Sequence, residues 1–377
     1  MRDQGAPDDG EDIRSDGAPS NLRALRLRSQ LLTGAKGGSP EDVVGRILAV
    51  QAQDERGCRL AVRSRSEGLS SRRIDDALTA RRLVVTWLNR GTLHLVRSED
   101  YWWLHPLTAP RTGSAIDHRL RQLGVTDRQR DRGVGAVVTA LESEGPLVRS
   151  ALRDRLADEG FPAEGEAVFP LLATASLRGL IVRGPMVEGG QAFVSVRRWL
   201  GHAPSLPGRQ ASLGRLAVRY LDGHGPASPE DLSRWSGVTL GDARSAFEHA
   251  AGEVRPSGAV FVRSESDLDH TDVPPTRLLG PFDPILHGWS SREMWVGGHR
   301  SVVTKNGIFR AVVLSEGRVK GTWRLAPPGI EVEVLDPLDD RAQAELMEDA
   351  ADVYRFLGQE GPPDAVRLSP SGLRPFA

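Results

Sequence analysis

The sequence predicts an α+β protein that is mainly helical, with helical units that end in β-hairpins and a β-rich C-terminal part. Three observations support this fold class. Apolar residues recur at helical spacing through most of the chain as far as about residue 273. Helical stretches are followed by short apolar strands that flank a glycine-containing turn. Beyond Pro274 the pattern changes to a series of short strands before one last helix.

Residues 1–20 are acidic and rich in Gly, Pro and Asp, and we expect them to form a disordered tail. They hold six acids and two bases, which leaves 47 basic and 44 acidic residues and a net charge of +3 in the rest of the chain. The whole chain has a formal net charge of −1. Binding to nucleic acid would therefore need a local basic patch and not a general positive field.

The first unit is expected over residues 21–125. Its helices are predicted at 21–33, 40–50, 54–64 and 71–80, and its strand pair lies within 83–97. Ser39 is expected to cap the second helix, with Pro40 in the first helical position and Asp42 three residues after the cap. In the second strand of the pair, His94 should point to the face opposite Leu93 and Leu95.

Gln51-Ala52-Gln53 follows directly after the amphipathic second helix and is the candidate catalytic motif. Two neutral amides at a helix exit can hold a water molecule or a nucleic-acid group without adding net charge. A polar helix end with no further role is the alternative that the residues alone leave open. For the next residue, Asp54, capping of the following helix is favoured over a role as a base.

The second unit is expected over 126–207 and the third over 208–273. In the second, helices begin near Asp127, Val148 and residue 166, and a hairpin turns at Gly189-Gly190. In the third, the tetrapeptide at 228–231 repeats the one at 39–42 letter for letter. The repeated order predicts tandem winged-helix units, each a helix-turn-helix with a β-hairpin. Chance recurrence of a common helix cap is the alternative.

The fourth part, 274–377, is expected to be β-rich, with strands at 276–282, 293–296, 308–314, 318–325 and 330–335 and a helix from Asp340 to Leu357. Along 318–325, Arg318, Lys320, Thr322 and Arg324 alternate with mostly apolar residues, so one face of the strand is basic. This face is either a DNA-contacting surface or the solvated outer side of a small sheet.

Several classes of site have no support in the sequence. The histidines show no metal-ligand spacing, Cys58 is the only cysteine, and no phosphate loop or nucleophile elbow occurs, so we expect no metal and no cofactor. Cys58 is expected to be a small buried residue. No apolar run is long enough for a membrane span and no secretion signal is recognisable, so we expect a cytoplasmic protein that does not bind membranes.

The order of a helix, Gln51-Ala52-Gln53, a helix and then Arg-Gly-Thr-Leu-His-Leu-Val at 90–96 resembles a bacterial winged-helix superfamily of DNA glycosylases. Its AlkZ-type members carry Gln-apolar-Gln at the catalytic position and its YcaQ-type members carry Gln-apolar-Asp, so this chain resembles the AlkZ type. The resemblance runs from about Asn21 to the C-terminal region.

The resemblance implies a monomeric, monofunctional DNA glycosylase with Gln51 and Gln53 as its catalytic residues. Its implied substrate is double-stranded DNA that carries bulky N7-alkylguanine. Unhooking of interstrand crosslinks and self-protection in a producer of a DNA-alkylating natural product are further implications. A winged-helix transcription regulator and a non-catalytic binder of alkylated DNA are the rival functions.

Six residues are candidate DNA contacts: Arg90, His94, Arg292, Arg318, Lys320 and Arg324. Arg90 lies at the tip of the turn between the two strands, where contact with a phosphate is favoured over simple solvation. His94 is expected to contact either the substrate or a backbone group beneath the hairpin. A surface ion pair is the alternative for Arg292. Asp283, which precedes a proline, is expected to shape a turn.

Overall fold

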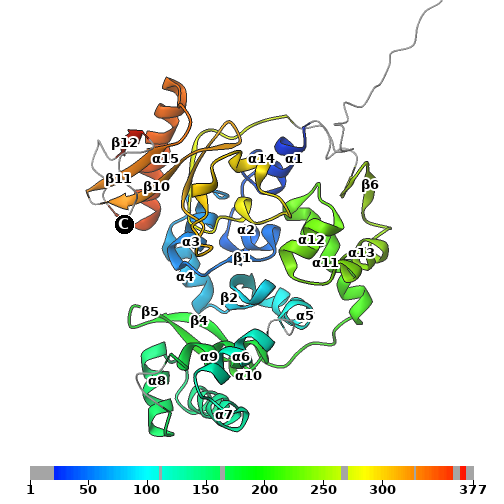
Figure 1. Cartoon of the computed structure of the whole chain (residues 1–377), viewed down its shortest axis with the longest axis vertical. Coiled ribbons are helices and arrows are strands. Elements are labelled where there is room, and N and C mark those ends of the chain that lie inside the picture. The colour runs from blue at the N-terminus through cyan, green and yellow to red at the C-terminus, as the bar shows by residue number, and fades with distance from the viewer. Residues whose placement is uncertain are drawn as a thin grey trace, which may run out of the picture.

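The computed structural model describes residues 21–109, 113–161, 166–264, 271–326, 328–359 and 366–370, so the predicted tail at 1–20 lies outside the described residues. Within these ranges the chain is mainly helical and contains two five-stranded sheets and one two-stranded sheet. The helical units and the C-terminal sheet occupy different sides of the molecule (Figure 1). The predicted α+β class with a helical majority is confirmed.

The first unit contains four helices and three strands. They are α1 (Leu22–Ser29), α2 (Pro40–Ile47), β1 (Val50–Gln51), α3 (Glu55–Arg63), α4 (Ser71–Thr79), β2 (Leu83–Trp87) and β3 (Leu93–Arg97). Ser39 caps α2 as predicted, because its hydroxyl accepts a hydrogen bond from the Asp42 backbone N–H at 3.1 Å.

Two helices of this unit end earlier than predicted. The helix expected over 21–33 ends at Ser29, and Leu31 has a positive φ of 55°. The helix expected over 40–50 ends at Ile47, because Leu48 adopts a positive φ of 70° that a helix cannot contain. The following Val50 and Gln51 pair with β3 instead. The glutamine motif therefore starts on a short strand and not at a helix exit.

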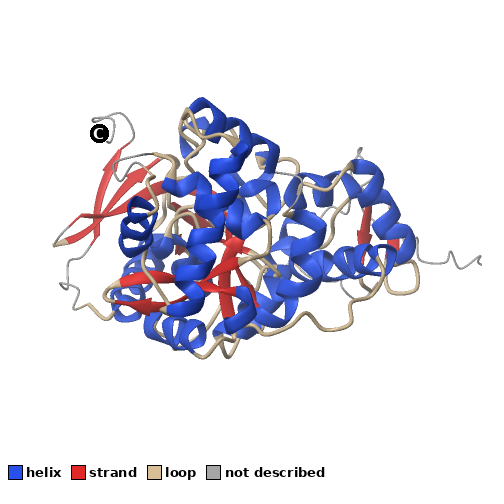
Figure 2. Cartoon of the chain, turned by 90° about the horizontal axis from the view of Figure 1, so that it is seen from below, coloured by secondary structure: helices blue, strands red, loops and turns tan. Residues whose placement is uncertain are grey.

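The hairpins of the first two units form a single sheet with the strand order β1-β3-β2-β4-β5. In the second hairpin, β4 (Ile181–Val187) pairs with β5 (Gly190–Ser195), and Val85 of β2 lies opposite Arg183 of β4. Helices lie around these strands (Figure 2). The helices between and after the hairpins are α5 (Ser98–Thr108), α6 (Gly113–Gln122), α7 (Asp127–Ser143), α8 (Arg149–Asp158), α9 (Val168–Leu177) and α10 (Val196–Trp199).

The third unit contains three helices and a short hairpin. They are α11 (Arg209–His224), α12 (Pro229–Ser236), α13 (Leu240–His249), β6 (Arg255–Ser257) and β7 (Val260–Val262). Ser228 and Asp231 form a reciprocal capping box at the start of α12, with hydrogen bonds of 3.1 and 3.2 Å. Helix α11 packs against α1, α2 and α5, so this unit is joined to the first one. The unit boundaries proposed from the sequence stay predictions.

The C-terminal sheet has the strand order β12-β11-β10-β9-β8. Its elements are β8 (Arg277–Leu279), β9 (Val312–Ser315), β10 (Arg318–Ala326), β11 (Gly329–Val334), α15 (Asp340–Leu357) and β12 (Val366–Pro370). The strand predicted at 293–296 is wrong, because these residues form the helix α14 (Glu293–Val296) with Trp295 buried. A run of three apolar residues, here 294–296, does not distinguish a strand from a buried helical turn.

Buried ion pairs attach the C-terminal part to α3. Arg63, at the end of α3, donates to both carboxylate oxygens of Asp349 on α15, at 2.9 and 3.1 Å, and to the Leu278 carbonyl at 2.7 Å. Burial opposes ionisation of Asp349, but Arg63 and Arg277 outweigh it and lower the pKa of that carboxyl group. The helix that follows the glutamine motif is therefore held on the C-terminal sheet.

Candidate active site

Strand pairing fixes the positions of the two glutamines. In the antiparallel pair of β1 and β3, Val50 lies opposite Leu95 and Gln51 lies opposite His94. The pairing continues one residue further, since the Ala52 N–H donates to the Leu93 carbonyl at 2.7 Å. Residues directly opposite each other share a face of the sheet, and so do residues two apart along a strand. Gln51, Gln53 and His94 therefore have their side chains on the same face.

The two amides are joined to each other. Gln51 Nε2 donates a hydrogen bond to Gln53 Oε1. The Gln51 side chain is buried and Gln53 is exposed, so the pair spans from the interior to the surface. Gln51 Oε1 is buried and has no hydrogen-bond partner among the described residues. The pair thus presents one free acceptor oxygen whose position is set by a neighbouring amide and by the sheet.

Asp54 caps the next helix, as the sequence predicted. Its carboxylate accepts a hydrogen bond from the Gly57 backbone N–H at 2.5 Å at the start of α3. Gly57 leaves no room for a side chain, because a Cβ there would collide with the backbone oxygen of Pro281. The start of α3 is therefore packed against the segment that carries Asp283 and His287.

His94 is buried and is held by the backbone. Its Nδ1 lies 2.9 Å from the Thr92 carbonyl oxygen, the backbone contact that the sequence left as one of two alternatives. Burial lowers the pKa of His94 to about 3; the charge of Arg90 and nearby His287 act in the same direction, and the bond to Thr92 opposes them. At neutral pH the imidazole is uncharged, so its Nδ1 carries the proton and donates to Thr92.

Arg90 is not the solvated tip of an open hairpin. It lies in the 3-10 turn η1 (Asn89–Gly91), where its φ is 56° and its backbone contacts Gly237 at the end of α12. Its Nε is buried without a hydrogen-bond partner among the described residues. Burial lowers the pKa of Arg90, and the positive charges of Arg234 and Arg292 lower it further.

Arg292 makes no carboxylate contact among the described residues, so the surface ion pair considered for it is not seen. Its Nε donates to the Leu286 carbonyl at 3.3 Å, and its guanidinium lies 5.0 Å from the centre of the Phe309 ring. Burial and the nearby charge of Arg234 lower the pKa of Arg292. The side chain is therefore held by an aromatic ring and a backbone oxygen, and no acidic side chain among the described residues neutralises its charge.

Asp283 has the predicted turn role and a second role that the sequence did not reveal. Its Oδ1 accepts from the Ile285 N–H at 3.0 Å and so caps the 3-10 turn η4 (Pro284–Leu286). Both carboxylate oxygens also receive hydrogen bonds from Arg65, at 2.8 and 2.9 Å, and neither side chain has any exposure to solvent. This pair joins the chain just after α3 to the segment that leads to His287 and Arg292.

The basic residues of β10 have acidic neighbours. Arg324 pairs with Glu331 of β11 at 2.6 Å, and Lys320 lies 3.8 Å from Glu316. Arg318 is exposed at the start of the strand. The predicted alternation is present except at Thr322, which is buried and donates to Glu333 at 3.1 Å. Much of the positive charge on this face is therefore compensated within the sheet.

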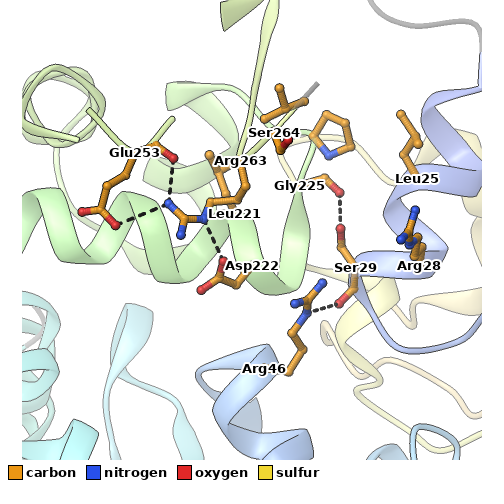
Figure 3. Close-up of a pocket in the computed structure, with 12 residues that line it drawn as sticks. Leu25, Arg28, Ser29, Arg46, Leu221, Asp222, Gly225, Glu253, Arg263 and Ser264 are labelled. Carbon is orange, nitrogen blue, oxygen red and sulfur yellow. Dashed lines mark hydrogen bonds and ion pairs between the residues drawn. The ribbon is translucent and has the colours of Figure 1, made fainter. Parts of the chain in front are cut away.

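Two pockets are relevant to ligand binding. The larger, with a volume of about 830 Å³, begins at Asp54, next to Gln53, and extends to Phe309, Trp323 and Arg324. A smaller pocket of about 400 Å³ lies among α1, α2, α11 and the β6–β7 hairpin (Figure 3). In it Arg263 pairs with Asp222 at 3.0 Å. Neither glutamine lines either pocket, but Asp54, which directly follows Gln53, lines the larger one. The larger pocket is the one that adjoins the candidate catalytic motif.

Three further residues of this region were not predicted from the sequence: Asn89, Arg234 and His287. Both polar atoms of the Asn89 side chain are buried and lack partners among the described residues. Burial lowers the pKa of His287 to about 4, and the charge of Arg90 contributes. Arg234 is an exposed arginine on a helix, and nothing in its local sequence indicates that it lies close to Arg90.

No cluster of three or more His, Cys, Asp or Glu side chains within the described ranges could hold a metal ion. Across the same ranges, no helix has the length and apolar character that crossing a bilayer requires. Cys58 is buried, and burial raises the pKa of its thiol to about 11, in line with a structural role.

Comparison with known proteins identifies the family. Residues 44–356 match the family model described as DNA glycosylase AlkZ-like. The chain is 28% identical over 355 residues to the interstrand DNA cross-link repair glycosylase of Streptomyces sahachiroi, covering 89% of this chain and 95% of that protein. The solved structure of the Streptomyces sahachiroi DNA glycosylase AlkZ matches with a TM-score of 0.76 at 27% identity, covering 93% of this chain and 98% of the other.

The matched fold and the family model together define a DNA glycosylase. The chain belongs to the AlkZ-like family, as the glutamine motif and the hairpin sequence suggested. DNA is accordingly the substrate of this protein.

Proposed function

We propose that this chain is a monofunctional DNA glycosylase that hydrolyses the N-glycosidic bond of bulky N7-alkylguanine in double-stranded DNA. Gln51 and Gln53 are its catalytic residues. The observation that carries this assignment is the buried, unpartnered Oε1 of Gln51, fixed by the bond to Gln53 and by pairing of β1 with β3. The name of the Streptomyces sahachiroi relative supports action on interstrand crosslinks. We further propose that this activity protects a producer of a DNA-alkylating compound.

Two amides suffice because the lesion activates its own leaving group. Alkylation at N7 makes the guanine cationic, so no strong acid is needed to protonate it. A water oxygen attacks the sugar C1′, the C1′–N9 bond breaks, its electron pair neutralises the departing base, and the water proton passes to solvent. Gln51 Oε1 accepts a hydrogen bond from that water, and its negative end faces the oxocarbenium-like sugar. An amide is too weak a base to remove the proton itself.

The pocket beside Asp54 supports a preference for bulky lesions. Its volume of about 830 Å³ lies within the range that accommodates drug-sized ligands. Apolar residues such as Ile308, Phe309 and Trp323 line it, together with charged ones. A substituent on the guanine could enter this space while the sugar stays at the glutamines.

We propose that Arg90, His94, Arg292, Arg318, Lys320 and Arg324 contact the DNA. His94 is buried and neutral, so it would act through a hydrogen bond and not through charge. Arg318 keeps an exposed side chain on the basic face of β10. We further propose that the protein acts as a monomer in the cytoplasm.

Excision of N7-methylguanine tests the proposal. The purified protein is incubated with a duplex containing N7-methylguanine, and released base and alkali-labile abasic sites are measured. We expect Gln51→Ala and Gln53→Ala to lower the single-turnover rate by at least about 10²-fold, since losing the position of a reacting group has effects of this size. Gln122→Ala, on an exposed site of α6, is the matched control.

DNA affinity is measured for every variant, and we expect it to change little. Full activity in both glutamine variants would remove the catalytic assignment. Tight binding of alkylated DNA by the wild-type protein without any released base would overturn the enzymatic function in favour of a non-catalytic binder.

A further inference from the structure

We propose that Arg90, Arg234 and Arg292 together bind one phosphate of the DNA backbone next to the lesion and thereby position its sugar at the two glutamines. This inference rests on the proposed function in one respect, namely that the glutamine site acts on a nucleotide in DNA. It adds Arg234 to the site and assigns the three arginines to a single shared group.

The three arginines come from distant parts of the chain. Arg90 lies in η1, Arg234 in the last turn of α12, and Arg292 directly before α14. The backbone N and the Cγ of Arg90 lie 3.2 Å from where a Cβ on Gly237 would stand, so η1 packs against the end of α12. The Ser290 backbone N–H donates to the Asp231 carboxylate at 2.9 Å, which joins the segment before α14 to α12. Burial is the main cause of the lowered pKa of Arg90 and of Arg292, and the nearby charge of Arg234 lowers both further.

No acid compensates these charges among the described residues. Several buried or half-buried arginines of the chain are paired: Arg59 with Asp75 at 2.5 Å, Arg63 with Asp349 at 2.9 Å and Arg65 with Asp283 at 2.8 Å. By contrast, neither Arg90, Arg234 nor Arg292 has an ion pair within the described ranges, and Arg90 Nε is buried without a partner. Three like charges gathered without an acid repel one another, and an anion bound among them would relieve that repulsion.

Two of the three side chains are already held in place. Arg90 adopts a left-handed φ of 56°, which is unfavourable for a non-glycine residue and persists because η1 is packed against α12. Arg292 is fixed by Phe309 and the Leu286 carbonyl. A pre-positioned guanidinium loses less conformational entropy when it binds a ligand. Arginine also presents several donors in a planar arrangement that suits phosphate oxygens.

The cluster adjoins the catalytic motif. Arg90 is near enough to His94 to help lower the pKa of that imidazole, and His94 lies directly opposite Gln51 in the sheet. A phosphate held by the cluster would therefore belong to the lesion nucleotide or its immediate neighbour. The arginines are positioning residues, since they hold the backbone and do not touch the bond that breaks.

DNA binding without catalysis tests this site. Fluorescence anisotropy is measured on an undamaged duplex and on one with a tetrahydrofuran abasic analogue. Arg234→Ala should weaken binding and reduce the slope of log K against log salt by about one unit, as expected for one lost phosphate contact. Arg234→Lys should retain the slope because the charge remains. Arg341→Ala, at a site 84% exposed on α15, is the matched control.

A single uncharged methylphosphonate linkage is then moved along the strand on both sides of the abasic analogue. At one linkage the wild-type protein should lose about as much affinity as Arg234→Ala loses on ordinary DNA. At that linkage Arg234→Ala should lose no further affinity when the phosphate is replaced, because its contact with that phosphate is already absent. The same non-additivity should appear for Arg292→Ala. Inorganic phosphate, added at constant ionic strength, should compete with DNA for the wild-type protein and less for Arg234→Ala.

The shared phosphate site would be overturned if Arg234→Ala and Arg292→Ala both had the same salt slope as Arg341→Ala. Additive losses of DNA affinity at every methylphosphonate linkage would overturn it as well. Competition by inorganic phosphate that is the same in the wild type and in Arg234→Ala would also count against it. Because none of these measurements needs base release, failure of the wild type to excise N7-methylguanine would refute the proposed function without deciding the phosphate site.

Discussion

Removing Asp283 should destabilise the protein strongly, because it would leave a buried arginine charge without its partner. Both side chains of the Arg65–Asp283 pair are fully shielded from solvent, and two hydrogen bonds of 2.8 and 2.9 Å join them. Arg65 Nη2 also donates to Gln30 Oε1 at 2.8 Å, and Gln30 Nε2 donates to the Gly223 carbonyl at 2.5 Å. The pair therefore links α1, α3 and α11 with the segment that precedes His287.

Breaking a buried ion pair from one side costs about 3–5 kcal/mol. We expect Asp283→Ala to lower the free energy of unfolding by an amount in this range. Asp283→Asn should lose most of the same stability, although its amide oxygen can still cap Ile285. The double variant Arg65→Met/Asp283→Ala should lose less than the sum of the two single variants, because no unpaired charge then stays buried.

Urea unfolding followed by tryptophan fluorescence and by far-ultraviolet circular dichroism measures this effect, and coincidence of the two curves checks that one transition is observed. Glu230→Ala, which removes the exposed pair with Arg244, is the control and should change stability by about 1 kcal/mol or less. An Asp283→Ala variant as stable as this control would refute the reasoning. Additive losses in the double variant would show that the charge of Arg65 is not the cause.

Two further predictions concern pH and salt. Burial lowers the pKa values of His94 and His224 to about 3 and that of His287 to about 4, so the unfolded chain binds these protons more readily below about pH 6.5. The free energy of unfolding should therefore fall as the pH drops from 6.5 towards 4, by at most about 1.4 kcal/mol per pH unit for each histidine. His94→Gln should reduce this dependence on pH. A free energy of unfolding that does not change with pH in urea unfolding would contradict the prediction. DNA affinity should weaken steeply with salt, and Arg318→Ala should reduce the slope by about one unit if it contacts a phosphate; an unchanged slope in anisotropy titrations would remove Arg318 from the interface.

Local sequence signals predicted much of the fold. Ser39 and Ser228 marked the starts of α2 and α12, and the alternation around His94 marked β3. These features depend on neighbours within a few residues, which is the range over which capping and periodicity act. The short range of these signals also explains why some element ends were predicted incorrectly. The end of α2 at Ile47 depends on β1 pairing with a strand more than forty residues away, and no local pattern shows it.

The candidate site was predicted in part for the same reason. Gln51 and Gln53 are adjacent in sequence and part of a recognisable motif, so they could be proposed from the residues and the family resemblance. The placement of His94 opposite Gln51 required the register between β1 and β3. Arg234 could not be found, because what distinguishes it from any exposed helical arginine is its closeness to Arg90 and Arg292 in the folded chain.

A net charge of −1 is compatible with binding DNA because of where the unpaired charges lie. Most of the buried arginines of the described chain are matched by acids, as Arg63 is by Asp349 and Arg26 by Asp231. Their fields cancel at short range, and salt screens what remains beyond about 8 Å. Among the described residues Arg90, Arg234 and Arg292 lack such acids, and Arg90 lies close to His94, the residue opposite Gln51. Attraction of the phosphate backbone is thus concentrated at the place where the chemistry requires the sugar to stop, and adding basic residues elsewhere would raise affinity without improving that placement.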